Sequence, residues 1–154
     1  MNWNIRKGTL QDADTIAGFQ VDMAMESEGT VLDAETLLKG VAAGLADPAK
    51  GTYFVVTAES PEKKGEIVGS MLLTKEWSDW NNCWYWWIQS VYIRPEFRRM
   101  GAFSAMYDEI RRMAKDEGST SLRLYVDKEN IKAQECYRRN GMDECHYLMF
   151  EENI

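Results

Sequence analysis

The chain has few of the residues that build metal sites and disulfide frameworks. It contains three cysteines, Cys83, Cys136 and Cys145, and a single histidine, His146. The cysteines are odd in number and form no Cys-x-x-Cys pair, which is typical of reduced residues in a cytosolic protein. One histidine does not supply the ligand set of a structural zinc site, so we expect no metal.

Long apolar runs and an excess of basic residues are also missing. No apolar segment approaches the length that crosses a membrane, and residues 1–10 lack the charged-then-apolar pattern of a leader. The net charge of -7 opposes contact with the phosphate backbone of nucleic acid. We therefore expect a cytoplasmic protein with no membrane and no nucleic-acid partner. The acidity suits a cationic or amine substrate, although an acidic surface more often serves solubility.

What the chain does contain is an ordinary globular composition. Hydrophobic residues make up 45% and charged residues 28% of its 154 positions, enough to bury a core without disulfides or metals. No repeat, linker or low-complexity tract divides the sequence. We therefore expect a single domain over residues 1–154.

Periodicity, caps and turn residues predict the element order β-α-α-β-β-β-α-β-α-β. Thr9, with Asp12 three residues later, begins the first helix, and Asp33 caps a second that ends at Asp47-Pro48. The later helices are expected at residues 101–115 and 130–139, and the strands at residues 3–6, 53–58, 67–74, 86–93, 122–126 and 147–150. Consecutive hairpins followed by strand–helix–strand crossovers indicate an α/β fold with a mixed sheet and helices on both faces.

The most informative segment runs from Trp86 to Gly118. An apolar strand breaks at Arg94-Pro95, and a basic, glycine-containing turn from Arg98 to Ala102 leads into an amphipathic helix. The first turn of a helix has unpaired N–H donors and a partial positive charge, so an anion there accepts several hydrogen bonds. The segment predicts a cradle for phosphate groups; the alternative is a solvated basic turn.

Two separate motifs, in this order, resemble the GNAT superfamily of acetyl-CoA-dependent N-acetyltransferases. The segment from Val91 to Ala102 is similar to that family's Arg/Gln-x-x-Gly-x-Gly/Ala pyrophosphate loop. The segment from Asn130 to Met142 matches its pattern of Asn, Ala three residues on, Tyr seven on and Gly eleven on. One position departs, because Phe103 stands where the loop's last small residue would fall.

The resemblance implies a GNAT-like acyl-CoA N-acyltransferase fold with acetyl-CoA as co-substrate. Backbone N–H groups of the loop would bind the pyrophosphate, and backbone groups of the preceding strand would hold the pantetheine arm. Tyr137 would protonate the departing CoA thiolate, although a buried structural tyrosine is the alternative. The expected cofactor contacts are Val91, Ile93, Arg98, Arg99, Met100, Gly101, Ala102, Phe103, Ser104, Asn130 and Tyr137.

The acceptor side carries weaker signals. The implied reaction is direct attack of an amine on the thioester, which requires a base near the acceptor. Glu26 and Glu28 lie where this family's first two helices border the acceptor site, so both are candidate catalytic residues, and Glu28 is also a candidate substrate contact. Asp79 is a further candidate contact. Each of these acids is also consistent with a plain surface role.

Tryptophans are crowded before the phosphate loop. Five of six fall within eleven positions: Trp77, Trp80, Trp84, Trp86 and Trp87. Alternation along a strand sends Trp84 and Trp86 to one face and Trp87 to the other, so one core cannot take them all. We expect Trp77 and Trp86 to wall the acceptor pocket by cation–π or stacking contacts, with sheet packing as the alternative.

Three functional hypotheses follow from the sequence. The first is an N-acetyltransferase acting on an amine of a small molecule or a protein. The second is a GNAT-like module that senses acyl-CoA without turnover, and the third is an aromatic-walled ligand-binding or assembly domain without a CoA role. The acceptor stays unidentified, because function is grafted onto a fold rather than fixed by it. A homodimer is an open expectation, since dimers are common among proteins of this kind.

Overall fold

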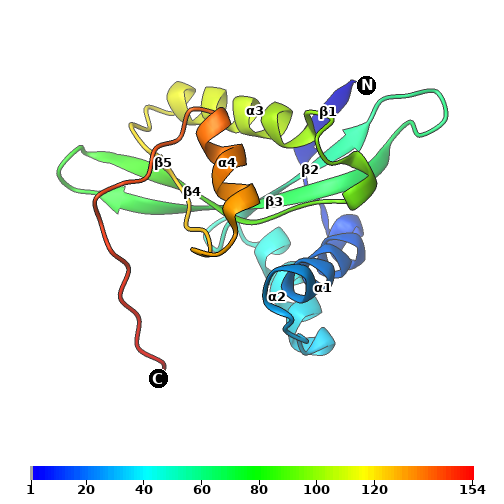
Figure 1. Cartoon of the computed structure of the whole chain (residues 1–154), viewed down its shortest axis with the longest axis horizontal. Coiled ribbons are helices and arrows are strands. Elements are labelled where there is room, and N and C mark those ends of the chain that lie inside the picture. Colours follow the sequence, from blue (N-terminus) through cyan, green and yellow to red (C-terminus); the bar gives the residue numbers. More distant parts are fainter. Residues whose placement is uncertain (1) are drawn as a thin grey trace.

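The computed structural model describes residues 2–154, whose strands form one mixed sheet in the order β1-β2-β3-β4-β5 (Figure 1). The first four strands are antiparallel neighbours, and β5 runs parallel to β4. The strands are β1 (Trp3–Lys7), β2 (Thr52–Ala58), β3 (Glu66–Ser78), β4 (Cys83–Ile93) and β5 (Leu122–Arg123). The helices are α1 (Ala13–Glu28), α2 (Ala34–Ala46), α3 (Ala102–Asp116) and α4 (Ile131–Arg139), with short 3-10 turns η1 (Leu10–Asp12) and η2 (Pro95–Phe97).

Helices cover both faces of the sheet, as the sequence predicts. Figure 1 shows α1 and α2 on one side and α3 on the other. A hydrophobic cluster lies on each face of the sheet, and strand β2 contributes to both because its side chains point alternately to the two faces. Tyr53 and Val55 pack against α1 and α2, whereas Phe54 and Val56 belong to the larger cluster under α3. Of the helices described in residues 2–154, none is long and apolar enough to cross a membrane.

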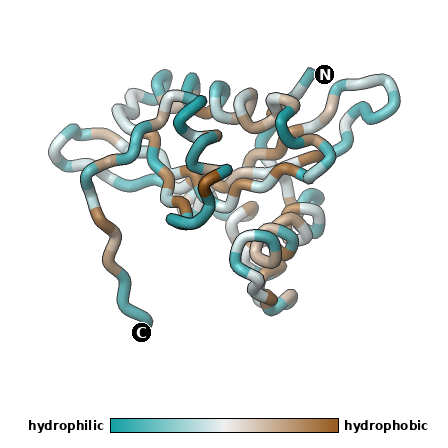
Figure 2. Tube along the Cα trace, viewed as in Figure 1, coloured by the Kyte–Doolittle hydropathy of each residue, from teal (hydrophilic) through white to brown (hydrophobic). Residues whose placement is uncertain are grey.

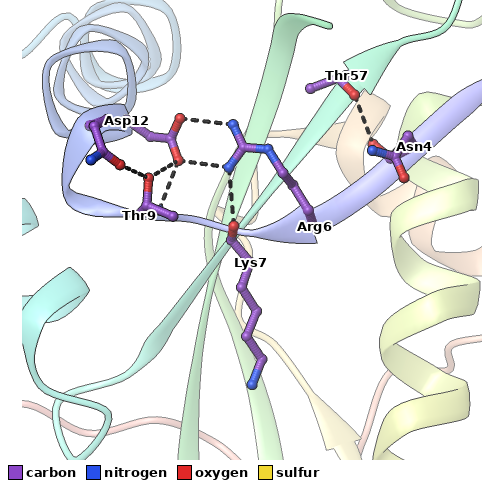
Figure 3. Close-up of polar contacts among 7 residues, drawn as sticks. Asn4, Arg6, Lys7, Thr9, Asp12 and Thr57 are labelled. Carbon is purple, nitrogen blue, oxygen red and sulfur yellow. Dashed lines mark hydrogen bonds and ion pairs between the residues drawn. The ribbon is translucent and has the colours of Figure 1, made fainter.

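The start of α1 is tied to β1 by a charged cluster (Figure 3). Arg6 donates two hydrogen bonds to the Asp12 carboxylate, at 2.8 and 2.9 Å. The backbone N–H of Thr9 donates to the same carboxylate at 2.8 Å, which confirms Asp12 as the partner of Thr9. This side-chain hydrogen bonding from Arg6, opposed by desolvation, lowers the pKa of Asp12 to about 2.

A β-bulge interrupts the middle of β4. Between the pairs Ser70–Tyr92 and Leu72–Gln89, two residues of β4 lie opposite one residue of β3. Ser90, in the bulge, has a left-handed backbone with φ 46°, and its carbonyl accepts a hydrogen bond from the Gln20 side chain of α1. The bulge therefore joins the end of β4 to α1.

Two predicted strands are corrected by the structure. Strand β5 contains only Leu122 and Arg123, because β4 pairs with it at Trp86 and Trp87 alone. The predicted strand at residues 147–150 is wrong: these residues have no strand partner and lie exposed in a C-terminal segment that leaves the body (Figure 1). Their β-forming side chains met the local criteria for a strand, but pairing is a tertiary property. Strand β3 is also longer than predicted and takes in Trp77 and Ser78.

Candidate active site

The predicted phosphate loop connects the end of β4 to the start of α3. Arg94 continues the β3–β4 ladder through its N–H, which donates to the Val68 carbonyl at 2.9 Å, and η2 then turns the chain. Arg99 and Gly101 both have left-handed backbone conformations, with φ 61° and 88°. Gly101 is the residue that precedes the first turn of α3.

The first turn of α3 offers free donors. No side chain caps it, and the first intrahelical bond runs from Ala105 N–H to the Gly101 carbonyl. Among residues 2–154, the N–H groups from Arg99 to Ser104 have no hydrogen-bond acceptor. A Cβ built on Gly101 would meet only the Trp3 Nε1 atom within 4 Å, at 3.8 Å, so the space over the loop is open. These donors and the helix dipole fit a phosphate group.

The loop is held from beneath by aromatic side chains. The Trp3 indole N–H donates to the Met100 carbonyl at 3.1 Å, and Phe97 packs edge-on against the Trp3 ring with the ring centroids 6.2 Å apart. Phe97 is only 2% exposed. The loop is therefore fixed through one carbonyl and one buried ring, and its N–H groups stay free.

Phe103, the departure from the family pattern, turns its ring toward α4. Its centroid lies 6.0 Å from the ring of Tyr107 and 5.6 Å from the ring of Tyr137. Asn130 caps α4 by accepting the Ala133 N–H at 3.1 Å. Phe103 thus packs Tyr137 against the first turn of α3, and the large side chain at this position has a structural role. Burial raises the pKa of Tyr137 above its ordinary value of 10.0.

The two loop arginines differ in their surroundings. Arg98 turns back under β4: its Nε donates to the Ile93 carbonyl at 2.7 Å, and its Nη2 donates to Glu26 at 2.7 Å. The guanidinium carbon lies 5.3 Å from the centroid of the Tyr92 ring. Arg99 is exposed and makes no ion pair among the described residues. Arg99 is therefore the arginine that is free to contact an anion at the loop.

Glu26 belongs to a pocket of about 370 Å³ between α1 and the end of β4. It accepts the Tyr92 hydroxyl at 3.2 Å in addition to Arg98. Burial and then the negative charge of Glu26 raise the pKa of Tyr92 to about 12. Arg94 forms ion pairs with Glu66 and with Glu96. The pocket is lined by Asp22, Met25, Glu26, Tyr92, Arg94, Pro95 and Glu96.

Comparison with known proteins agrees with this geometry. The model of the acetyltransferase (GNAT) family matches residues 21–142. The crystal structure of a possible acetyltransferase from Clostridium difficile 630 is 42% identical, with 100% of this chain and 99% of that chain covered and a TM-score of 0.89. The chain belongs to the GNAT acetyltransferase family.

Two more distant structures share the GNAT fold. AAC(6')-Iy, solved with the bisubstrate analog CoA-S-monomethyl-acetylneamine, is 14% identical over 100% of this chain and 99% of that one, with a TM-score of 0.78. A predicted acetyltransferase from Clostridium acetobutylicum, solved with acetyl-CoA, is 16% identical over 97% of this chain and 96% of that one, with a TM-score of 0.73. Acetyl transfer is the class of reaction that the family supports.

Several predicted acceptor residues of this GNAT chain lie away from the pocket. Trp77 and Asp79 are at the tip of the β3–β4 hairpin, where Trp77 packs against Trp84 and Asp79 accepts the Trp80 N–H. Most of the length of β4 separates that tip from Ile93, which is about 30 Å of extended strand. Trp86 is 3% exposed and belongs to the core under α3. Glu28 is exposed at the last turn of α1 and has no side-chain partner among the described residues.

The structure brings together residues that no sequence motif singles out. Tyr92 and Asp22 both line the pocket with Glu26. In the sequence, Tyr92 lies inside an apolar strand and Asp22 lies on the polar stripe of a helix. Neither pattern distinguishes these two residues from their neighbours. Within residues 2–154, no group of three or more His, Cys, Asp or Glu side chains is placed to hold a metal ion.

Proposed function

We propose that this GNAT protein is an N-acetyltransferase that moves the acetyl group of acetyl-CoA to an amine by direct attack in a ternary complex. One observation carries the proposal: the uncapped first turn of α3, with its N–H groups from Arg99 to Ser104 free, lies beside Tyr137 of α4. A donor set for phosphates thus lies on the same turn of α3 whose Phe103 ring packs against Tyr137, the proposed proton donor. The acetyl thioester supplies the activated carbonyl when acetyl-CoA is bound.

The residues of the loop fit the pyrophosphate. Gly101 lets the backbone approach closely, and the exposed guanidinium of Arg99 adds positive charge beside the N–H groups. Beyond Trp87 the edge of β4 that faces β5 has no strand partner, so its backbone can receive the pantetheine arm near Val91. The carbonyl of Ile93 is already bonded to Arg98. Ile93 would therefore contribute through groups other than this carbonyl.

Tyr137 supports the proposal as a general acid. Burial raises the pKa of its hydroxyl, so Tyr137 stays protonated at neutral pH and has a proton to give. The thiol of CoA has a pKa of about 8.5, so its thiolate is a fair leaving group. Tyr137 therefore has the protonation state that the role requires.

Cys136 is its neighbour, and burial raises the pKa of that thiol, which opposes a nucleophilic role.

The pocket beside Glu26 suits a cationic amine as acceptor. Three of its side chains are carboxylates: Asp22 makes no ion pair among the described residues, Glu26 is paired with Arg98, and Glu96 shares Arg94 with Glu66. An ammonium group is attracted to such a site, and Glu26 can take a proton from the amine before attack.

The free thiols of Cys83, Cys136 and Cys145 are consistent with a reducing cytoplasmic setting.

The decisive experiment compares two glycines at opposite ends of α3. Gly101 and Gly118 have φ 88° and 77°, and neither would meet a steric obstacle with a Cβ. Both Gly101→Val and Gly118→Val impose similar backbone strain, but only the first changes the phosphate loop. We expect Gly101→Val to weaken acetyl-CoA binding at least tenfold in calorimetry, with Gly118→Val near wild type. Equal affinity in the two variants would contradict the cradle.

A second measurement separates the enzyme from an acyl-CoA sensor. Acetyl-CoA should raise the melting temperature, and a panel of polyamines, aminoglycosides and peptide N-termini should include an amine that releases free CoA thiol. Stabilisation by acetyl-CoA without thiol release for any amine would favour the sensor. No stabilisation at all would support the third hypothesis, a domain with no CoA role.

A further inference from the structure

The pocket beside Glu26 contains one carboxylate that the protein itself does not neutralise. Glu26 is paired with Arg98 at 2.7 Å. Glu96, on the other side of the pocket, is paired with Arg94. Asp22 makes no ion pair with any of residues 2–154, although it lines the same pocket. A carboxylate without a partner is the group that a bound cation contacts at the smallest cost, because no existing pair has to be broken.

Asp22 and Glu26 lie one turn apart on the same face of α1. Residues four positions apart on a helix have Cβ atoms about 5–6 Å from each other. Figure 2 shows hydrophilic and hydrophobic positions alternating along this helix. Burial, followed by the negative charges of Glu26 and Asp22, raises the pKa of Tyr92 to about 12, so both carboxylates are close to the Tyr92 hydroxyl. The pocket therefore offers two anionic positions about one helical turn apart.

Tyr92 adds a polar group to the pocket from a buried side chain. Tyr92 lines the pocket, and only 5% of the residue is exposed. Its hydroxyl donates its one proton to Glu26 at 3.2 Å, and none of residues 2–154 donates a hydrogen bond to it. The oxygen can therefore still accept a hydrogen bond from an N–H group. An ammonium group beside Asp22 would satisfy this acceptor together with the free carboxylate.

Apolar side chains complete the wall of the pocket. Met25 and Pro95 line it together with the acids, and its volume is about 370 Å³. That volume is near the lower end of the about 300–1,000 Å³ of small-molecule sites. Methylene groups gain free energy by leaving water for such a wall. The pocket thus suits a short alkyl chain with a positive charge near each end.

Given the proposed acetyl transfer, on which this inference rests, we infer that the acceptor is a short alkyl diamine. Its reacting nitrogen lies at Glu26, and its second nitrogen lies at Asp22 as an ammonium group. Single bonds of about 1.5 Å advance an extended chain by about 1.25 Å each, so nitrogens separated by about three to five carbons are about 5–7.5 Å apart. This span matches the two carboxylates. Asp22 is then the residue that selects a second positive charge.

The two nitrogens have different fates in the reaction. The reacting nitrogen gives one proton to Glu26, which passes it to water, and forms the N–C bond to the acetyl carbon. The C–S bond breaks, the thiolate takes the proton of Tyr137, and the second proton that the nitrogen loses on becoming an amide restores Tyr137. The nitrogen at Asp22 keeps its proton, because an alkylammonium group has a pKa of about 10.4, as in lysine. The product has lost one of the two charges, so it is held less tightly than the substrate.

The first test compares two acceptors that differ in one group. Butane-1,4-diamine and 4-aminobutan-1-ol have the same chain length, but only the diamine carries a second charge. In a CoA thiol-release assay, the wild type should show at least a tenfold higher kcat/KM for the diamine, because a charged hydrogen bond is lost with the alcohol. In Asp22→Asn this ratio should fall to about twofold or less, mainly through the KM of the diamine.

The matched control is Asp14→Asn, which removes the same charge from the exposed first turn of α1, outside the pocket. It should keep the wild-type ratio, which excludes an effect of net charge alone. Circular dichroism checks that both variants are folded. Equal kcat/KM for the two amines, or a preference for the diamine that survives Asp22→Asn, overturns the inference and leaves acetyl transfer standing.

Binding without turnover separates this inference from the proposed activity. Butane-1,4-diamine is titrated by calorimetry into the wild type, Asp22→Asn and Asp14→Asn in the presence of CoA. We expect a Kd at least tenfold weaker in Asp22→Asn and near wild type in Asp14→Asn. Equal Kd values in all three chains, or no binding by the wild type, overturn the diamine site. If this binding pattern holds but no amine releases CoA thiol, the proposed activity is wrong and the diamine site remains.

Discussion

Replacing Asp12 with asparagine should lower the free energy of unfolding by about 2 kcal/mol at neutral pH. Asp12 is 6% exposed and accepts two hydrogen bonds from Arg6 and one from the Thr9 N–H. Side-chain hydrogen bonding from Arg6 is the largest cause that lowers its pKa from 3.8 to about 2. At about 1.4 kcal/mol per unit of pKa, this difference corresponds to about 2 kcal/mol. Asparagine keeps the shape and removes the charge.

The dependence on pH has a definite sign. Because the pKa of Asp12 is lower in the folded state than in the unfolded chain, the unfolded chain binds a proton first as the pH falls. The stabilisation is complete above about pH 5, declines from about pH 4 and is lost below about pH 2. A protonated Asp12 and the asparagine that replaces it are nearly equivalent, so the wild type and the variant should converge in acid.

Urea unfolding followed by tryptophan fluorescence, repeated from pH 7 down to the lowest pH at which the wild type is folded, measures this difference. The matched control is Glu35→Gln, which removes a surface pair with Lys39 whose side chains are 78% and 74% exposed and should cost less than about 0.5 kcal/mol. A loss at pH 7 no larger than that of the control would refute the reasoning. A loss of the same size at every pH would assign it to packing instead of charge.

Three further outcomes test the site and the core. Tyr137→Phe should lower kcat on the order of 10²-fold and leave the acetyl-CoA Kd unchanged in calorimetry; unchanged kcat would remove the acid role. Glu26→Gln should raise KM for cationic amines about tenfold, or about 1.4 kcal/mol, and Glu28→Gln should not; equal effects would place the acceptor elsewhere. Ile110→Ala, at a fully buried position of α3, should cost about 2–5 kcal/mol in urea unfolding, and a loss below about 1 kcal/mol would contradict its place in the core.

Features encoded by short-range rules were predictable from the sequence. Asp33 and Asn130 cap α2 and α4 by accepting N–H groups three residues on, which depends only on side-chain type and spacing. The turn at Gly101 between a strand and a helix is equally local. The element order up to α4 and the two-faced mixed sheet follow from such signals.

Features that depend on distant partners were not predictable in the same way. The hydrogen bond from Tyr92 to Glu26 joins residues 66 positions apart, and no pattern in either element distinguishes them. The segment from Tyr147 to Phe150 satisfies every local rule for a strand, yet a strand exists only where an edge receives it. Trp77 and Trp86 are close in sequence, but the extended strand and its alternation place Trp77 at a hairpin tip and Trp86 in the core.

Strand β2 makes the two sides of the molecule mechanically dependent on each other. Val55 and Val56 are adjacent and fully buried, yet one belongs to the packing beneath α1 and α2 and the other to the packing beneath α3. A side chain that is too large at either position displaces the backbone both share, so it disturbs the opposite face as well. The helix that carries Glu26 and the helix that begins at the phosphate loop therefore pack over opposite faces of one shared strand. Evolution of a new acceptor preference on one side has to preserve the register of that strand to keep the other side intact.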